Sequence, residues 1–287
     1  MSKKILNRFE QDLQLRGLTK LTREAYLRAA VKFMGFHAGP VSRAKSRDVS
    51  DFLHHLMSEK HFTASTVNQY VAALRLLFSV TLDKSWALEK IVFAKTPKKL
   101  PDVLSGSEML KVLKAFDSVK HRTVALVCYG AGLRINETLH LKVEDIDSNR
   151  SVIHVRQGKG QKDRHVPLSP RLLEALRLYF KHTRPTGAYL FEGRGRDRAM
   201  TKAAFGKALK PTVKKAGVKK HVTAHVFRHC YATHMIEAGA DLRSVQLLLG
   251  HASIQSTARY VHLTTARRLA LSSPLELLGK PAGQILG

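Results

Sequence analysis

The segment SVIHVRQGKGQKDRHVPLS (residues 151–169) decides the fold class of this chain. Apolar and polar residues alternate on both sides of a turn rich in glycine and lysine, which is the pattern of a β-hairpin. Before and after this segment, apolar residues recur at helical spacing. We therefore predict a mainly α-helical protein with a small β-sheet or hairpin, to which AYLF (188–191) adds a short strand.

Residues 1–95 predict a helical domain of their own. We expect an opening helix near Lys4–Leu15, and Thr22 and Ser50 are each placed to cap a later helix. From Ser65 onward, apolar residues gather on one face of a further helix. These segments indicate a bundle of about four helices.

The segment KTPKKLPDVLSGSEM (95–109) predicts the connection between two domains. It contains two prolines and three lysines, and it ends in a capping box formed by Ser105 and Glu108. We expect a linker over 96–104 and a second, mixed α/β domain over 105–287. Its later helices are expected at 201–216, 224–238 and 241–249, around Tyr260, and near the C-terminus.

The charge of the chain indicates the class of its partner. Lysine and arginine number 49 against 22 aspartates and glutamates, a formal net charge of +27. Basic residues are in excess on both sides of residue 100, so the charge is not confined to a tail. A surface of this kind favours a nucleic acid. Ribosomal-type RNA binding and an anionic membrane surface are the alternatives.

Compartment and membrane signals point to a cytoplasmic protein. The sequence has no apolar run of about 20 residues and no secretory signal at its start. Its two cysteines, Cys128 and Cys230, are too few for a disulfide framework and suit a reducing cytoplasm. We expect both to be small buried residues.

Six residues indicate little about function when each is taken alone, but together they indicate one type of reaction. In chain order they are Arg134, Lys159, His225, Arg228, His251 and Tyr260. Two guanidiniums can bind the oxygens of a phosphodiester and stabilise its transition state. A histidine can bond a phosphate oxygen or take the proton of the nucleophile, and a lysine can protonate a leaving 5′ oxygen. A tyrosine can form the covalent ester. The set predicts phosphoryl transfer with neither metal nor other cofactor.

Several of these residues also have a plainer interpretation. Arg134 is three residues before Glu137 and can simply pair with it, so we expect Glu137 to orient Arg134 or a histidine. Lysines such as Lys159 are common at hairpin tips for solubility. Tyr231 is a rival nucleophile because it lies one turn from Arg228, but we expect it to pack in the core.

A metal site is the alternative for the segment AHVFRHCYATH (224–234). His225 and His229 have the i, i+4 spacing of a helical zinc site, with Cys230 beside them. A third ligand at suitable spacing is absent from the sequence pattern, so we predict no metal. We expect His229 and His234 to bond backbone groups or phosphate.

The combined motifs resemble the tyrosine recombinase family of phage integrase and Xer type. AGLRINETLHL resembles its first arginine motif, GKGQKDRHVPL its lysine-bearing β-turn, and AHVFRHCYATHMIEAG its H-x-x-R helix. LGHASIQSTARYVH is similar to its histidine and tyrosine segment, so Tyr260 is the expected nucleophile. The resemblance covers 105–265 well and 1–95 more loosely, as a core-binding domain. The sequence shows neither the N-terminal arm-site domain of lambda-type integrases nor, between Lys159 and His225, room for the insertion of integron integrases, so we expect a simple two-domain Xer-like enzyme.

The resemblance implies a site-specific recombinase acting on double-stranded DNA. It implies cleavage through a 3′-phosphotyrosyl intermediate, a Holliday junction, and a homotetramer on two DNA sites with a dimer on each. It also implies a nucleoid-associated enzyme of chromosome, plasmid, phage or transposon, with or without an accessory or partner recombinase. A type IB topoisomerase and a non-catalytic DNA-binding relative are the alternatives. The leucine-bearing tail from about residue 265 is expected to dock on a neighbouring protomer or on its own domain.

Overall fold

Two structural units divide the chain in the computed structural model, Met1–Lys99 and Leu100–Gly287. The structure describes residues 2–96, 102–156, 163–195 and 197–250, together with Ser253, Thr257 and Tyr260. The predicted domain boundaries at residues 95 and 105 stay predictions.

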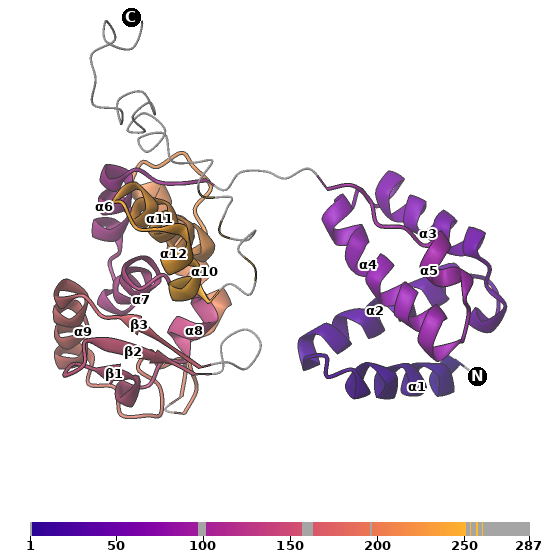
Figure 1. Ribbon diagram of the computed structural model, residues 1–287, viewed down its shortest axis with the longest axis horizontal. Helices are drawn as coiled ribbons and strands as arrows, with labels where there is room; N and C mark the ends of the chain where they lie inside the picture. The colour runs from indigo at the N-terminus through magenta and orange to yellow at the C-terminus, as the bar shows by residue number, and fades with distance from the viewer. Residues whose placement is uncertain are drawn as a thin grey trace, which may run out of the picture. The chain divides into compact units, whose positions relative to one another are not determined.

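The first unit is a helical bundle (Figure 1). A 3-10 turn at Val41–Arg43 and a π-helical turn at Leu77–Thr81 interrupt it. Its helices are α1 (Ser2–Leu15), α2 (Lys20–Phe36), α3 (Ser46–Ser58), α4 (Ala64–Leu76) and α5 (Trp86–Lys90). Phe33 is fully buried in the centre, with its ring edge-on to Phe52 at 5.4 Å and to Phe78 at 5.5 Å between centroids. Aromatic pairs of this geometry add to the stabilisation that burial provides.

Two predicted helix starts in this unit are wrong. Helix α2 begins at Lys20, because Thr19 is the N-cap and its hydroxyl accepts a hydrogen bond from the Thr22 amide. Helix α3 begins at Ser46, so Ser50 lies inside it and donates its hydroxyl to the Ser46 carbonyl at 3.1 Å. Serine and threonine bond nearby backbone groups both at caps and within helices, and the residue type alone does not mark the start.

The second unit places a small sheet among helices (Figure 1). Its first half contains α6 (Gly106–Ala115), α7 (Val119–Gly130), the short α8 (Ile135–Leu139) and a 3-10 turn at Val143–Asp145. The sheet follows with β1 (Ile146–Asp147), β2 (Val152–Val155) and β3 (Arg164–Pro167). The remaining helices are α9 (Pro170–Thr183), α10 (Lys202–Lys215), α11 (Ala224–Glu237) and α12 (Leu242–Leu249).

The sheet confirms the predicted β-hairpin. Its strands are antiparallel in the order β1-β2-β3, and Val155 of β2 lies opposite Arg164 of β3. The side chains of Ile153, Val155 and Val166 lie on one face of the sheet and pack in the hydrophobic core. The predicted capping box at the start of α6 is also confirmed, since Ser105 and Glu108 each bond the other's backbone N–H. This hairpin register sets Arg164 at the start of β3.

The predicted strand at 188–191 is wrong. These residues form no ladder: Leu190 is held by single bonds, donating its N–H to the Leu141 carbonyl and accepting from the Tyr179 hydroxyl. Leu190 and Phe191 are buried in the core. The apolar run therefore marks a buried loop, which tertiary contacts fix without a neighbouring strand.

Helix α11 is the centre of the second unit. It packs against α7 on one side and α12 on another, and buried residues occur on several of its faces. Phe227 and Cys230 enter the main core, while Tyr231 and Ile236 join a smaller cluster with Val245, Leu249 and Tyr260. A helix apolar on several sides is typical of one that is covered by its neighbours. Among the described residues, no helix is long and apolar enough to cross a membrane.

Candidate active site

Arg134 is fixed at the N-terminus of α8 by the helix itself. The Glu137 carboxylate accepts from the Arg134 backbone N–H at 2.9 Å and from its Nη1 at 2.7 Å. The first amides of a helix lack partners within it, so a carboxylate three residues on satisfies one of them. The same contact holds the guanidinium, whose Nη2 donates to the Gly250 carbonyl at 3.0 Å.

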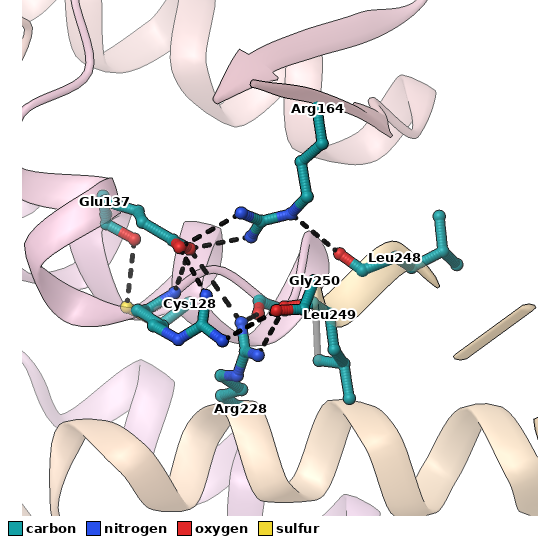
Figure 2. Close-up of polar contacts among 10 residues, drawn as sticks. Cys128, Glu137, Arg164, Arg228, Leu248, Leu249 and Gly250 are labelled. Carbon is teal, nitrogen blue, oxygen red and sulfur yellow. Dashed lines mark hydrogen bonds and ion pairs between the residues drawn. The ribbon is translucent and has the colours of Figure 1, made fainter. Parts of the chain in front are cut away.

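Glu137 also binds a second arginine, Arg164 of β3. The Arg164 Nη1 and Nη2 atoms donate to the two carboxylate oxygens at 3.1 and 2.8 Å, in a bidentate pair. Figure 2 shows the two groups facing each other. The side chain of Glu137 is 8% exposed. Burial by itself raises the pKa of this carboxyl, but the hydrogen bonds and charges of Arg164 and Arg134 outweigh it and lower the pKa to about 2.

Arg228 reaches the same place from α11, as Figure 2 shows. Its Nη1 donates to the Gly132 carbonyl at 2.7 Å, and its Nη2 to the Leu249 carbonyl at 2.5 Å. Nη1 is 3.9 Å from the nearer Glu137 oxygen. Burial and the charge of Arg134 lower the pKa of Arg228 to about 10, which still leaves it charged at neutral pH.

The C-terminus of α12 gathers all three guanidiniums. Leu248, Leu249 and Gly250 present consecutive carbonyls, and they accept from Arg164, Arg228 and Arg134 respectively. The last carbonyls of a helix have no partners within it and carry partial negative charge, so cations bind there. The end of α12 and Glu137 therefore hold three like charges within one small region.

Two glycines allow this close approach. Gly132 has φ +64°, and a Cβ there would lie 2.4 Å from the ring of Tyr231. Gly250 has φ +61°, and a Cβ there would lie 3.1 Å from the side chain of Arg164. Left-handed backbone is accessible to glycine at little cost. Their carbonyls are the ones that Arg228 and Arg134 bind.

Tyr260 lies against α11 beside this arginine cluster. Its hydroxyl is 2.8 Å from Nδ1 of His229, and the two ring centroids are 5.6 Å apart. The ring of His225 stacks next to His229 at 6.2 Å. Tyr260 is 1% exposed, and it is close enough to Arg228 for its ionised oxygen to raise the pKa of that guanidinium. Burial, then Lys202, Arg228 and Arg134, lower the pKa of His225.

The structure brings four of the six predicted residues into one region, namely Arg134, His225, Arg228 and Tyr260. Lys159 and His251 lie outside the described residues, as do the predicted C-terminal helix and the tail. The predicted supporting residue Glu137 is at the centre of the arginine cluster.

Tyr231 packs as predicted. It is 8% exposed and lies against Gly132, and burial raises the pKa of its phenol. The two cysteines are both buried, which confirms that prediction. The thiol of Cys230 accepts from the Leu104 backbone N–H at 3.2 Å, and burial raises its pKa to about 11.

Two functional contacts were missed in the sequence. Arg164 belongs to the quoted GKGQKDRHVPL motif, yet only the structure shows that its side chain contacts Glu137. The contact between His229 Nδ1 and the Tyr260 hydroxyl was not predicted, and the prediction that His229 bonds backbone or phosphate stays a prediction. The corresponding prediction for His234 is confirmed, because its Nε2 bonds the Leu104 carbonyl at 2.9 Å.

We expect Glu137→Gln to lower the free energy of unfolding by about 2–4 kcal/mol at pH 7, because three guanidiniums lose their shared carboxylate. A depressed pKa stabilises the fold above the ordinary value of 4.5, and this contribution is lost as pH falls toward about 2. Urea denaturation at pH 7 and pH 3 should show the gap between variant and wild type narrowing at pH 3.

The control for this prediction is Glu144→Gln. Glu144 is 60% exposed and makes surface ion pairs with Lys142 at 3.5 Å and Arg156 at 3.0 Å. Pairs of this kind contribute about 0–1 kcal/mol. A Glu137→Gln gap that stays the same at both pH values would contradict the proposed electrostatic origin.

Comparison with known proteins identifies the family of this chain. Residues 102–267 match the phage integrase family, and residues 5–88 match the N-terminal SAM-like domain of phage integrases. The chain belongs to the phage integrase family. The integrase/recombinase homologue y4qK of Sinorhizobium fredii is 42% identical over 277 residues, covering 96% of this chain and 89% of the relative. Tyrosine recombinase XerA of Pyrococcus horikoshii is 35% identical, covering 91% and 90%.

Solved structures share the fold. The complex of XerH recombinase with its difH substrate before cleavage has a TM-score of 0.69 at 25% identity, covering 88% of this chain and 78% of that chain. A lambda integrase dimer bound to a core site has a TM-score of 0.75 at 18% identity, covering 94% and 98%. The predicted family and fold class are confirmed. This integrase is thus a site-specific recombinase, a strand-exchange enzyme with a tyrosine nucleophile.

Proposed function

We propose that Tyr260 is the nucleophile with which this recombinase cleaves DNA. Its attack on a phosphodiester forms a 3′-phosphotyrosyl link and frees a 5′ hydroxyl. In the rejoining step the 5′ hydroxyl of a partner strand attacks this link and releases Tyr260. The observation that carries the proposal is the contact of the Tyr260 hydroxyl with His229 of α11, the helix that also supplies Arg228. Cationic neighbours favour the ionised form of a phenol, as this reaction requires.

Arg134 and Arg228 are the proposed phosphate-binding groups. A guanidinium has five N–H donors, and two of those on Arg228 bond the carbonyls of Gly132 and Leu249. These bonds fix the plane of the guanidinium before DNA arrives, and its other donors serve a phosphate. Donors that are held in place stabilise the charge of a transition state without further reorganisation. Glu137 is the proposed positioning residue for Arg134.

The roles of three further residues rest on the family resemblance. Lys159 is proposed to give a proton to the leaving 5′ oxygen, and His225 and His251 to bond phosphate oxygens. The phosphotyrosyl ester preserves the energy of the phosphodiester bond. We therefore propose that joining requires neither ATP nor a metal ion.

Double-stranded DNA is the proposed substrate and partner. Basic residues exceed acidic ones in both halves of the chain, which favours contact with phosphates over a long stretch of duplex. The relatives XerH and lambda integrase have been solved on DNA, the latter as a dimer on a core site. By this likeness we propose a dimer on each site and a homotetramer on two sites, with strand exchange through a Holliday junction.

Covalent capture on genomic DNA tests the proposed function. The full chain is incubated with sheared DNA of its host, the complexes are denatured and digested to a peptide stub, and the attachment points are sequenced. We expect the peptide that contains Tyr260 on 3′ phosphates at a recurrent site. Attachment through another residue, or no adduct at all, would overturn the proposal.

The same preparation separates the alternatives. A type IB topoisomerase would relax any supercoiled plasmid at low protein-to-DNA ratio and leave adducts scattered along the sequence. A non-catalytic DNA-binding relative would bind a nicked suicide duplex, in which the cleaved end diffuses away, without forming an adduct. A recombinase should accumulate adduct on that duplex and exchange strands between two intact copies of the site.

A further inference from the structure

The hydroxyl of Tyr260 is held by a histidine to which the family resemblance gave no role in catalysis. The Nδ1 atom of His229 lies 2.8 Å from it, within the range for proton transfer to a general base. His229 is on α11 directly after Arg228, and the ring of His225 stacks next to it on the same helix. The tyrosine oxygen is therefore next to an imidazole nitrogen before any substrate is bound.

The chemistry of attack requires an acceptor at this point. A phenol has an ordinary pKa near 10 and must lose its proton as its oxygen bonds to phosphorus. Tyr260 is 1% exposed, so bulk water has little access to that proton. The nearby guanidinium of Arg228 carries donors and no acceptor. A neutral imidazole nitrogen at hydrogen-bond distance supplies what the arginines lack.

We propose that His229 is a catalytic residue that accepts the phenolic proton of Tyr260 during cleavage; this rests on the proposed function. As the Tyr260 Oη–H bond breaks and the proton moves to Nδ1, Oη forms its bond to phosphorus. The bond from phosphorus to the 5′ oxygen breaks, and that oxygen takes a proton from the general acid, proposed to be Lys159. In rejoining, His229 returns its proton to the leaving tyrosine oxygen.

A second histidine on α11 provides a matched comparison. Nδ1 of His234 lies 2.9 Å from the hydroxyl of Tyr129, and its Nε2 bonds the Leu104 carbonyl at 2.9 Å. A carbonyl at Nε2 selects the tautomer with the proton on that nitrogen, so Nδ1 accepts from tyrosine. The helix thus holds two histidine–tyrosine pairs with nearly equal distances from Nδ1 to the hydroxyl, and only the pair with Tyr260 contains the proposed nucleophile.

The test uses His229→Asn in the full-length chain. The amide of asparagine replaces Nδ1 as a hydrogen-bonding group for the hydroxyl, but it does not take up a proton. On a nicked suicide duplex built on the mapped site, we expect the single-turnover rate of adduct formation to fall roughly 10²–10⁴-fold, the scale of general-base catalysis. Binding to the duplex, measured by gel shift, should stay within about two-fold of wild type.

A sulfur-substituted substrate separates proton acceptance from a structural role. When sulfur replaces the bridging 5′ oxygen at the cleavage point, the leaving thiolate needs no proton. This duplex should restore the rate of Lys159→Ala and leave His229→Asn slow. Restoration of His229→Asn would place His229 on the leaving group and overturn the proposal.

The controls keep the outcomes separate. His234→Asn makes the same exchange at the matched contact to Tyr129 and should cleave within about two-fold of wild type. Thermal denaturation of each variant checks folding, and His229→Gln replaces His229→Asn if the latter is unfolded. A wild-type rate in a folded His229 variant would falsify the His229 proposal alone. A wild-type chain that forms no Tyr260 adduct would remove the proposed function as well.

Discussion

Tyr260→Phe should bind the mapped DNA site with unchanged affinity and form no covalent adduct. The substitution removes one oxygen from a ring that is buried in a cluster with Val245 and Leu249, so the packing of the ring is kept. Without that oxygen the proposed ester has no atom through which to form. Denaturing gels of the suicide reaction measure the adduct, and gel shifts measure binding.

The control for this variant is Tyr231→Phe. Tyr231 is on the same helix as Arg228, is 8% exposed, and packs against Gly132. We expect its removal of a hydroxyl to leave the adduct rate within about two-fold of wild type. Adduct that persists in Tyr260→Phe, or adduct that is lost in Tyr231→Phe alone, contradicts the choice of nucleophile.

Arg228→Lys should slow adduct formation by about 10²–10³-fold or more, the scale for losing one held donor in a transition state. Lysine keeps the charge, but its single ammonium does not reproduce the planar fork that bonds Gly132 and Leu249 together. Two buried carbonyls then lose a donor, at a cost of about 1–3 kcal/mol each. Single-turnover cleavage and thermal denaturation together measure both effects.

A matched arginine separates stability from catalysis. Nη2 of Arg122 donates to the Phe116 carbonyl at 2.5 Å, in the same structural unit and outside the arginine cluster. Arg122→Lys should lower the melting temperature and leave the cleavage rate of the folded protein within about two-fold. If Arg228→Lys cleaves at the wild-type rate, Arg228 does not bind the scissile phosphate.

The elements that were predicted correctly are those with a local cause. The alternation around residues 151–169 gave the hairpin, and Ser105 with Glu108 gave the start of α6. Both depend on residues a few positions apart, whose geometry is set by the period of a strand or the first turn of a helix. The helix starts at Thr22 and Ser50 failed although they are local. Thr19 caps the first of these helices instead of Thr22, and the Ser50 hydroxyl bonds the Ser46 carbonyl from inside its helix.

The apolar run at 188–191 failed for a different reason. Leu190 and Phe191 are apolar, and both are buried. Whether a buried segment is a strand depends on a neighbouring strand to pair with. Here the backbone N–H of Leu190 donates to the Leu141 carbonyl, and the Leu190 carbonyl accepts from the Tyr179 hydroxyl, instead of bonding a neighbouring strand.

The sequence by itself indicated the family and the candidate residues for phosphoryl transfer. Arg134, His225, Arg228 and Tyr260 are each of a residue type that this reaction uses. Tertiary structure alone decided how they are held. Arg164 meets Glu137 across 27 positions, His229 meets Tyr260 across 31, and Arg134 meets Gly250 across 116. Spacing along the chain does not predict such contacts, because they form only when α11, α12 and the hairpin pack together.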